Sequence, residues 1–249
     1  MGEPLRHHAV GIDDVPDHDD WLTQPEADRI NGFRFAKRRE ETRLSRWTAK
    51  QTLARALGVD RSDPAQLRRV AVRNASDGAP EAYLDGAAAP VSISMTDRAD
   101  WAVCIVGDPS TSVGCDLELV EPRSQLFVED WFTEAERRFV ADRPDEHDLL
   151  ANTIWSAKES ALKVLRTGLR RDTRSVEVRL GAGDGRDGWA PLEVRSAEGA
   201  VFPGWWRQHD PFLLTCASTA PTAPPVSLVE PPPLATATPS HRWMERPVR

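Results

Sequence analysis

The chain has 249 residues, of which 40% are hydrophobic and 29% charged, as in an ordinary globular protein. A formal charge of −7 argues against a surface that binds nucleic acid over its whole extent. No apolar run approaches the roughly 18 residues of a membrane-spanning helix, and the N-terminus lacks the apolar segment of a secretory signal. Cys104, Cys115 and Cys216 are scattered in apolar runs, which predicts buried thiols in a cytoplasmic protein.

The hydrophobic pattern predicts an α+β fold, with helices packed on largely antiparallel sheets. In the first half we expect an N-terminal strand, then helices over about 25–35 and 38–57 and strands over 69–73, 81–84, 91–95 and 101–106. The second half should open with a strand over 113–118. Helices follow over 133–141 and 148–166, then strands over 175–180, 191–195, 200–207 and 212–217.

Short segments repeat in the same order in the two halves. Trp-Thr-Ala-Lys-Gln-Thr at 47–52 corresponds to Trp-Ser-Ala-Lys-Glu-Ser at 155–160, and 26–29 aligns with 134–137. Repeats of this kind indicate two similar modules. We therefore expect two halves related by a pseudo-twofold axis that bury a shared face, so that the protein is a monomer with the form of a dimer.

Composition and repeats together give three segments. Residues 1–108 form the N-terminal half and residues 109–220 the C-terminal half. Residues 221–249 are rich in proline and poor in apolar side chains, which predicts a tail that is either disordered or draped over the surface.

Asp116 and Glu118 lie two residues apart in a predicted strand, so both side chains point to one face. Two carboxylates on one face repel each other unless a proton or cation lies between them, and Mg²⁺ prefers such oxygen ligands. The alternative is an acidic strand edge in solvent.

Glu159 and Lys163 lie four residues apart on one face of a predicted helix. They could form a simple surface pair. However, the N-terminal half has Gln51 at the position of Glu159, so the extra carboxylate occurs only in the half that contains Asp116 and Glu118. This asymmetry indicates a metal site in one half.

A basic stripe follows one face of the helix over 38–57. It consists of Arg39, Arg43, Arg46 and Lys50. In an acidic chain such a stripe favours an anionic ligand, above all phosphate groups, over nucleic acid, because no aromatic stacking residues accompany it. A solvated helix face is the alternative.

Three motifs together resemble the 4′-phosphopantetheinyl transferases of the Sfp type, which consist of two similar α+β halves. They are Gly-Cys-Asp-Leu-Glu at 114–118, Phe-Thr-Glu-Ala-Glu at 132–136 and Trp-Ser-Ala-Lys-Glu-Ser-Ala-Leu-Lys at 155–163. The resemblance spans roughly residues 10–217 and includes the basic helix, Asp77–Pro80 and Ser92–Thr96.

The resemblance implies an enzyme that moves the phosphopantetheine arm of coenzyme A onto a serine of an acyl or peptidyl carrier protein and releases 3′,5′-ADP. Mg²⁺ would be held by Asp116, Glu118 and Glu159. Glu159 would also be the candidate base for the carrier serine, directly or through water, and Lys163 would offset charge on the phosphates. Further coenzyme A contacts are implied for Arg39, Arg46, Lys50, Ser94 and Lys158.

Two positions depart from the family pattern. Met95 stands where relatives have a histidine near the coenzyme A phosphates, and Ala79 where they often have lysine or arginine. Arg98 or Arg73 could compensate. These departures keep a second hypothesis open, a catalytically degenerate module that binds carrier proteins. A nucleic-acid-binding protein that uses the basic helix is a third.

Overall fold

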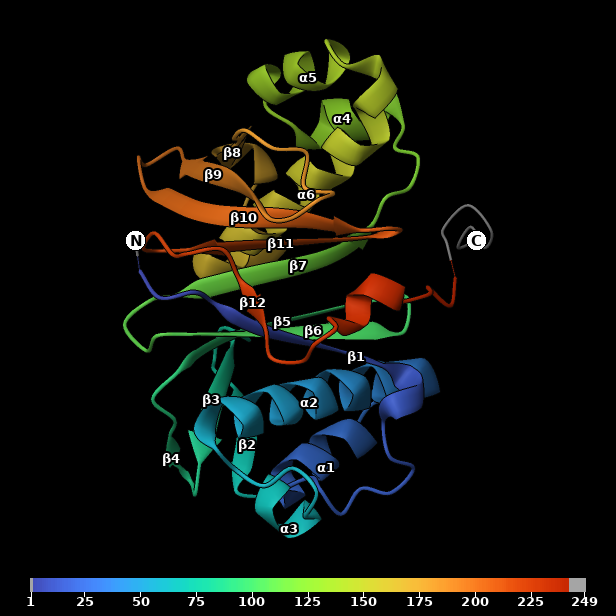
Figure 1. Ribbon diagram of the computed structural model, residues 1–249, viewed down its shortest axis with the longest axis vertical. Coiled ribbons are helices and arrows are strands. Elements are labelled where there is room, and N and C mark those ends of the chain that lie inside the picture. Colours follow the sequence, from blue (N-terminus) through green and yellow to red (C-terminus); the bar gives the residue numbers. More distant parts are fainter. Residues whose placement is uncertain (1, 242–249) are drawn as a thin grey trace.

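Two largely antiparallel sheets, each covered on one face by a long helix, build the molecule, of which the computed structural model describes residues 2–241 (Figure 1). One sheet has the order β12-β1-β6-β5 and the other the order β7-β11-β10-β9-β8. A small third sheet, β2-β3-β4, flanks the first. The fold is therefore α+β, as the sequence predicts.

The elements follow one order in both halves. The first half contains β1 (Arg6–Gly11), α1 (Gln24–Asn31), α2 (Ala36–Leu57), α3 (Pro64–Leu67), β2 (Val70–Asn74), β3 (Pro80–Leu84), β4 (Ala87–Ala88), β5 (Ser92–Arg98) and β6 (Trp101–Gly107). The second contains β7 (Val113–Leu119), α4 (Gln125–Trp131), α5 (Glu134–Ala141), α6 (His147–Val164), β8 (Val176–Leu180), β9 (Ala190–Ser196), β10 (Val201–His209) and β11 (Phe212–Ser218). The predicted helices and strands all form. The short α3, α4 and β4 were not predicted.

A buried ion pair ties each long helix to the rest of its half. Lys50 on α2 pairs with Glu26 at 2.9 Å, and its ammonium also donates to the backbone carbonyls of Leu67 and Val70. The other oxygen of Glu26 accepts the backbone N–H of Val72 at 3.0 Å. One network thereby joins α1, α2 and β2.

The C-terminal half repeats this network. Lys158 on α6 pairs with Glu136 at 2.8 Å and donates to the carbonyls of Thr173 and Val176, while Glu136 accepts the backbone N–H of Val178. Both glutamates also close the N-terminal capping box of their short helix. The counterpart of Glu26 is thus Glu136, and the sequence alignment that paired Glu26 with Glu134 was wrong by two residues.

The two large sheets meet along the edge strands β5 and β7. Ser94 on β5 accepts the backbone N–H of Cys115 at 3.0 Å, and Thr96 accepts that of Leu117 at 3.1 Å. Side-chain hydroxyls therefore take the place of a backbone ladder and satisfy strand donors that would otherwise be unpaired. Apolar side chains from β1, β6, β7 and β11 form one core cluster beside this seam. The three cysteines are free and buried, as predicted.

The described part of the Pro-rich tail packs against β1. The short strand β12 (Val226–Ser227) pairs with it in parallel, and the backbone N–H of Leu228 donates to the carbonyl of His7. Leu234 is 1% exposed and completes the apolar cluster between the halves. Up to residue 241 the tail therefore lies on the folded body; the remainder of the predicted tail, 242–249, lies outside the described residues. Among residues 2–241, none of the helices combines the length and hydrophobicity needed to span a bilayer.

The burial of His7 on β1 makes stability depend on pH. Burial, with the charges of His209 and Arg207, lowers the pKa of His7 to about 4. In the unfolded chain His7 takes up a proton as the pH falls below 6.5, whereas in the folded chain it stays neutral until the pH nears 4. The free energy of unfolding therefore has its full value above pH 6.5 and decreases as the pH falls toward 4.

We expect His7→Phe to remove about 2 kcal/mol of the stability loss that the protein shows between pH 7 and pH 5. Denaturant titrations of both proteins at the two pH values measure it. An equal pH dependence in the variant would contradict the assignment to His7.

Candidate active site

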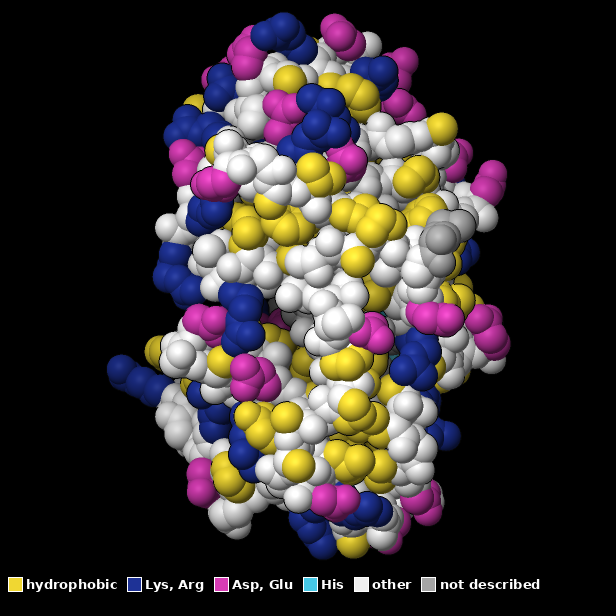
Figure 2. All heavy atoms as spheres, turned by 90° about the vertical axis from the view of Figure 1, so that its left-hand side faces the viewer, with side chains coloured by type: hydrophobic (Ala, Val, Ile, Leu, Met, Phe, Trp, Pro, Cys, Tyr) yellow, Lys and Arg dark blue, Asp and Glu magenta, His cyan; other side chains and the backbone are white. Residues whose placement is uncertain are grey.

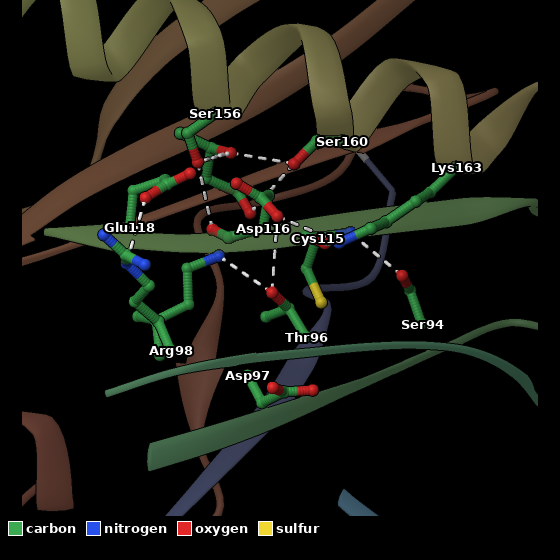
Figure 3. A network of polar contacts seen from close by, with 12 residues as sticks. Ser94, Thr96, Asp97, Arg98, Cys115, Asp116, Glu118, Ser156, Ser160 and Lys163 are labelled. Atoms are coloured by element: carbon green, nitrogen blue, oxygen red, sulfur yellow. Dashed lines mark hydrogen bonds and ion pairs between the residues drawn. The ribbon is translucent and has the colours of Figure 1, made fainter. Parts of the chain in front are cut away.

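The candidate site lies where α6 crosses β7 (Figure 3). Gly114 permits this crossing, because a Cβ at this position would collide with the carbonyl of Ser160. Ser156 on α6 donates to the carbonyl of Asp116 at 3.1 Å, and Ser156 and Ser160 both hydrogen-bond Thr215 on β11. The first residue of the Gly-x-Asp-x-Glu motif therefore sets how closely the helix approaches the acidic strand.

Asp116 is fixed on one side only. Its Oδ1 accepts from Lys163 Nζ at 3.0 Å and from Thr96 Oγ1 at 3.3 Å. Its buried Oδ2 has no hydrogen-bond partner among residues 2–241. A buried carboxylate oxygen without a donor is costly unless a ligand supplies the missing interaction.

Glu118 is held by one hydrogen bond and by two arginines, although its buried Oε2 also has no hydrogen-bond partner within residues 2–241. Oε1 accepts the indole N–H of Trp155 at 3.0 Å, and Oε2 lies 3.3 Å from Arg98 Nε and 3.6 Å from an Arg123 nitrogen. Burial and the charge of Asp116 raise the pKa of Glu118, whereas the two arginines oppose that rise. Figure 3 shows Glu118 directed toward Arg98 and away from Lys163.

Glu159 on α6 adds a half-buried carboxylate whose Oε1 likewise has no hydrogen-bond partner within the described chain. Burial, followed by the charge of Asp116, raises its pKa to about 7, and Lys163 opposes the rise. A carboxyl group that titrates near neutrality can accept a proton at physiological pH.

The three predicted metal ligands are not equivalent in this structure. Within residues 2–241, no three side chains of the acidic, histidine or cysteine type form a group able to hold a metal. Each of the three has one oxygen without a hydrogen-bond partner, but that of Glu118 lies within ion-pair distance of two arginines, whereas Asp116 and Glu159 interact electrostatically with each other. Two carboxylates with water and substrate phosphate suffice for Mg²⁺, so this pair fits the ion.

Lys163 connects the carboxylates to a cavity of about 720 Å³. Its ammonium also donates to the carbonyl of Cys115 at 2.8 Å. Burial alone would lower its pKa, but Asp116, Cys115 and Glu159 together outweigh burial and the pKa is raised, so the side chain stays charged. Ser94 lines the same cavity, although its hydroxyl oxygen is occupied by the N–H of Cys115.

Lys50 and Lys158 were expected to contact coenzyme A, but both side chains are fully buried in the ion pairs with Glu26 and Glu136. In this conformation neither ammonium reaches a ligand surface. The structure gives both lysines the role of holding a long helix against its sheet. Burial lowers the pKa of both, and the paired glutamates oppose this.

The other side chains of the basic stripe also form hydrogen bonds within the chain. Arg39 donates to the carbonyl of Phe33 at 2.8 Å. Arg43 donates to Asp19, and Arg46 to Asn74 at 2.6 Å, with its guanidinium 3.9 Å from the sulfur of Met95. The stripe lies on one helix face as predicted. Arg43 and Lys50 are paired with carboxylates, whereas Arg39 and Arg46 donate to neutral oxygens and Arg46 is buried.

Several residues of the site were not predicted. Arg123, Arg166 and Arg170 lie at the site and follow the Gly-x-Asp-x-Glu and Trp-x-x-Lys-Glu motifs by a few residues. Their only sequence signal is proximity to the motifs, since contacts across the seam between the halves leave no periodic pattern.

Comparison with known families identifies one region. A model of the 4′-phosphopantetheinyl transferase superfamily matches residues 112–187, which include Asp116, Glu118, Glu159 and Lys163. The match supports this superfamily. It is in keeping with phosphopantetheine transfer in general. A search of curated proteins found no match.

The buried pairs give a test that separates structural lysines from ligand contacts. Lys158→Met leaves Glu136 buried without its cation, so we expect destabilisation by about 3–5 kcal/mol. Lys50→Met should destabilise the protein in the same way, because Lys50 forms the equivalent buried ion pair with Glu26. The double variant Glu136→Gln/Lys158→Met should recover part of the stability. Thermal denaturation measures the stability of the three variants and of the wild type. A Lys158→Met protein with native stability and weakened coenzyme A binding would contradict the structural role of Lys158 and make it a ligand contact.

Proposed function

We propose that the protein transfers 4′-phosphopantetheine from coenzyme A to a serine of an acyl or peptidyl carrier protein, with Mg²⁺, and releases 3′,5′-ADP. The supporting observation is the pair of unpartnered carboxylate oxygens on Asp116 and Glu159, joined through Lys163 to a cavity of about 720 Å³. Cavities of this size are typical of cofactor sites.

In the reaction, the carrier serine oxygen attacks the phosphorus that bears the pantetheine arm. The bond from that phosphorus to the bridging oxygen breaks, and 3′,5′-ADP leaves with the electron pair. The serine proton passes to a base. Transfer of this kind depends chiefly on positioning and charge neutralisation.

Asp116 and Glu159 would hold Mg²⁺, which when bound neutralises charge on the pyrophosphate. Lys163, anchored on Asp116, would direct its ammonium to the phosphates. Glu159 is the candidate acceptor of the serine proton, directly or through water, because its Oε1 has no hydrogen-bond partner within the described chain. Glu118 would be a positioning residue that holds Arg98, Arg123 and the indole of Trp155 in place.

The three carboxylates should therefore differ in their effect on metal binding. Asp116→Asn and Glu159→Gln should each lower Mg²⁺ affinity by at least tenfold and abolish transfer, because each removes a carboxylate that forms no ion pair with an arginine within residues 2–241. Glu118→Gln should lower Mg²⁺ affinity less, because its charge is matched by arginines.

Calorimetric titration with Mg²⁺ and mass spectrometry of the carrier after incubation with coenzyme A measure both properties. Equal loss of Mg²⁺ affinity in all three variants would place Glu118 among the ligands. Transfer at the normal rate by the folded Asp116→Asn protein would contradict the proposed function. Binding of a carrier without release of 3′,5′-ADP by the unaltered protein would favour the degenerate module.

A further inference from the structure

Three cations line the cavity, and all come from the C-terminal half. They are Lys163, Arg166 and Arg170. The N-terminal half contributes Ala79 and Met95 to the lining, neither of which can bind an anion with its side chain. The cavity therefore has basic groups on one wall only.

Arg166 reaches across the cavity to the opposite wall. Its guanidinium contacts Asp77 at 2.7 and 3.2 Å and Glu81 at 3.3 Å, and both acidic residues also line the cavity. Arg170 donates to the backbone carbonyls of Asp77 and Arg166. Figure 2 shows basic and acidic side chains gathered at mid-height on this side of the molecule, over the boundary between the halves.

The backbone of Arg166 is unusual. The residue follows α6 with φ of 57°, and the N–H of Thr167 bonds back to the carbonyl of Leu162, which closes a Schellman-type helix end. Glycine normally occupies this position, because a side chain is disfavoured there. An arginine held in a disfavoured conformation at a cavity is the pattern found at ligand clamps.

The acidic partner is also held in place. Asp77 accepts the backbone N–H of Ala79, Asn74 donates to the carbonyl of Gly78, and Arg46 fixes Asn74 from α2. A rigid turn therefore presents Asp77 to Arg166. The contact is nevertheless open to competition, since the side chain of Arg166 is 44% exposed and that of Asp77 34%.

We propose that Arg166 and Arg170 form an anion subsite at the mouth of the cavity, where a phosphate group of coenzyme A displaces Asp77 from Arg166. The proposal rests on the proposed function for the identity of the ligand. Asp77 holds the guanidinium in position before the ligand arrives, and the phosphate then accepts the same N–H groups. In this way the C-terminal half supplies the positive charge that positions 79 and 95 lack.

Arg166→Gly is the decisive variant, because glycine suits the backbone and the fold should be kept. We expect its thermal midpoint to match or exceed that of the wild type, while calorimetry shows about tenfold weaker binding of coenzyme A with Mg²⁺. Arg174→Ala, which removes a surface arginine paired with Asp172 away from the cavity lining, is the matched control and should bind normally.

Asp77→Asn separates a ligand subsite from a simple tie between the halves. It keeps the shape of the turn and removes the competing charge, so coenzyme A should bind a few-fold more tightly. If Asp77→Asn weakens binding as much as Arg166→Gly, the pair is a structural tie and the proposal fails. It also fails if Arg166→Gly binds coenzyme A with unchanged affinity.

Dephospho-coenzyme A identifies the phosphate. A loss in Arg166→Gly confined to coenzyme A assigns the 3′-phosphate to the subsite, and an equal loss with both ligands assigns the pyrophosphate. Failure of the unaltered protein to bind coenzyme A would overturn the proposed function together with this inference, whereas normal transfer and binding by Arg166→Gly would overturn the inference alone.

Discussion

The seam between β5 and β7 is the constraint on which the site depends. Two sheet edges meet there without a backbone ladder. The hydroxyls of Ser94 and Thr96 accept hydrogen bonds from N–H groups of β7 that would otherwise be unpaired. Because side chains rather than peptides span the seam, the strands need not adopt ladder spacing. Thr96 also donates to Asp116, so the bridge between the halves holds an acidic residue of the site. A seam of this kind can carry a polar cavity that a continuous sheet would close.

The two similar halves show how one scaffold can carry a candidate site in only one of them. The Glu–Lys networks are nearly the same in both, which indicates that they serve the fold. The position after the lysine differs: Glu159 has an unpartnered buried oxygen, whereas the side-chain oxygen of its counterpart Gln51 accepts from Arg55 at 2.9 Å. A satisfied amide has no need of a cation. Ligand binding is therefore expected where the polar groups of the scaffold are left incomplete.

Local patterns in the sequence determined much of what could be predicted. Periodicity located the long helices and the strands, and the acidic and Trp-x-x-Lys-Glu motifs located Asp116 and Glu159. The sequence does not show in the same way which charged side chains are buried. Lys50 and Lys158 lie in basic or motif-rich stretches, and only the fold reveals that Glu26 and Glu136 enclose them. The role of Arg166 depends on Asp77, which is far away in the chain, so no local pattern could report it.

The charge balance of the site suggests how its ligands depend on each other. Asp116, Glu118, Glu121 and Glu159 face three cations, Lys163, Arg98 and Arg123, so most of the charge is matched before any ligand binds. Under the proposed function, Mg²⁺ brings two positive charges and the coenzyme A pyrophosphate two negative ones. Either ligand alone disturbs the balance in a partly buried place, where uncompensated charge is costly. Together they leave it unchanged, so each should strengthen the binding of the other, as linkage requires for two ligands that share one electrostatic site.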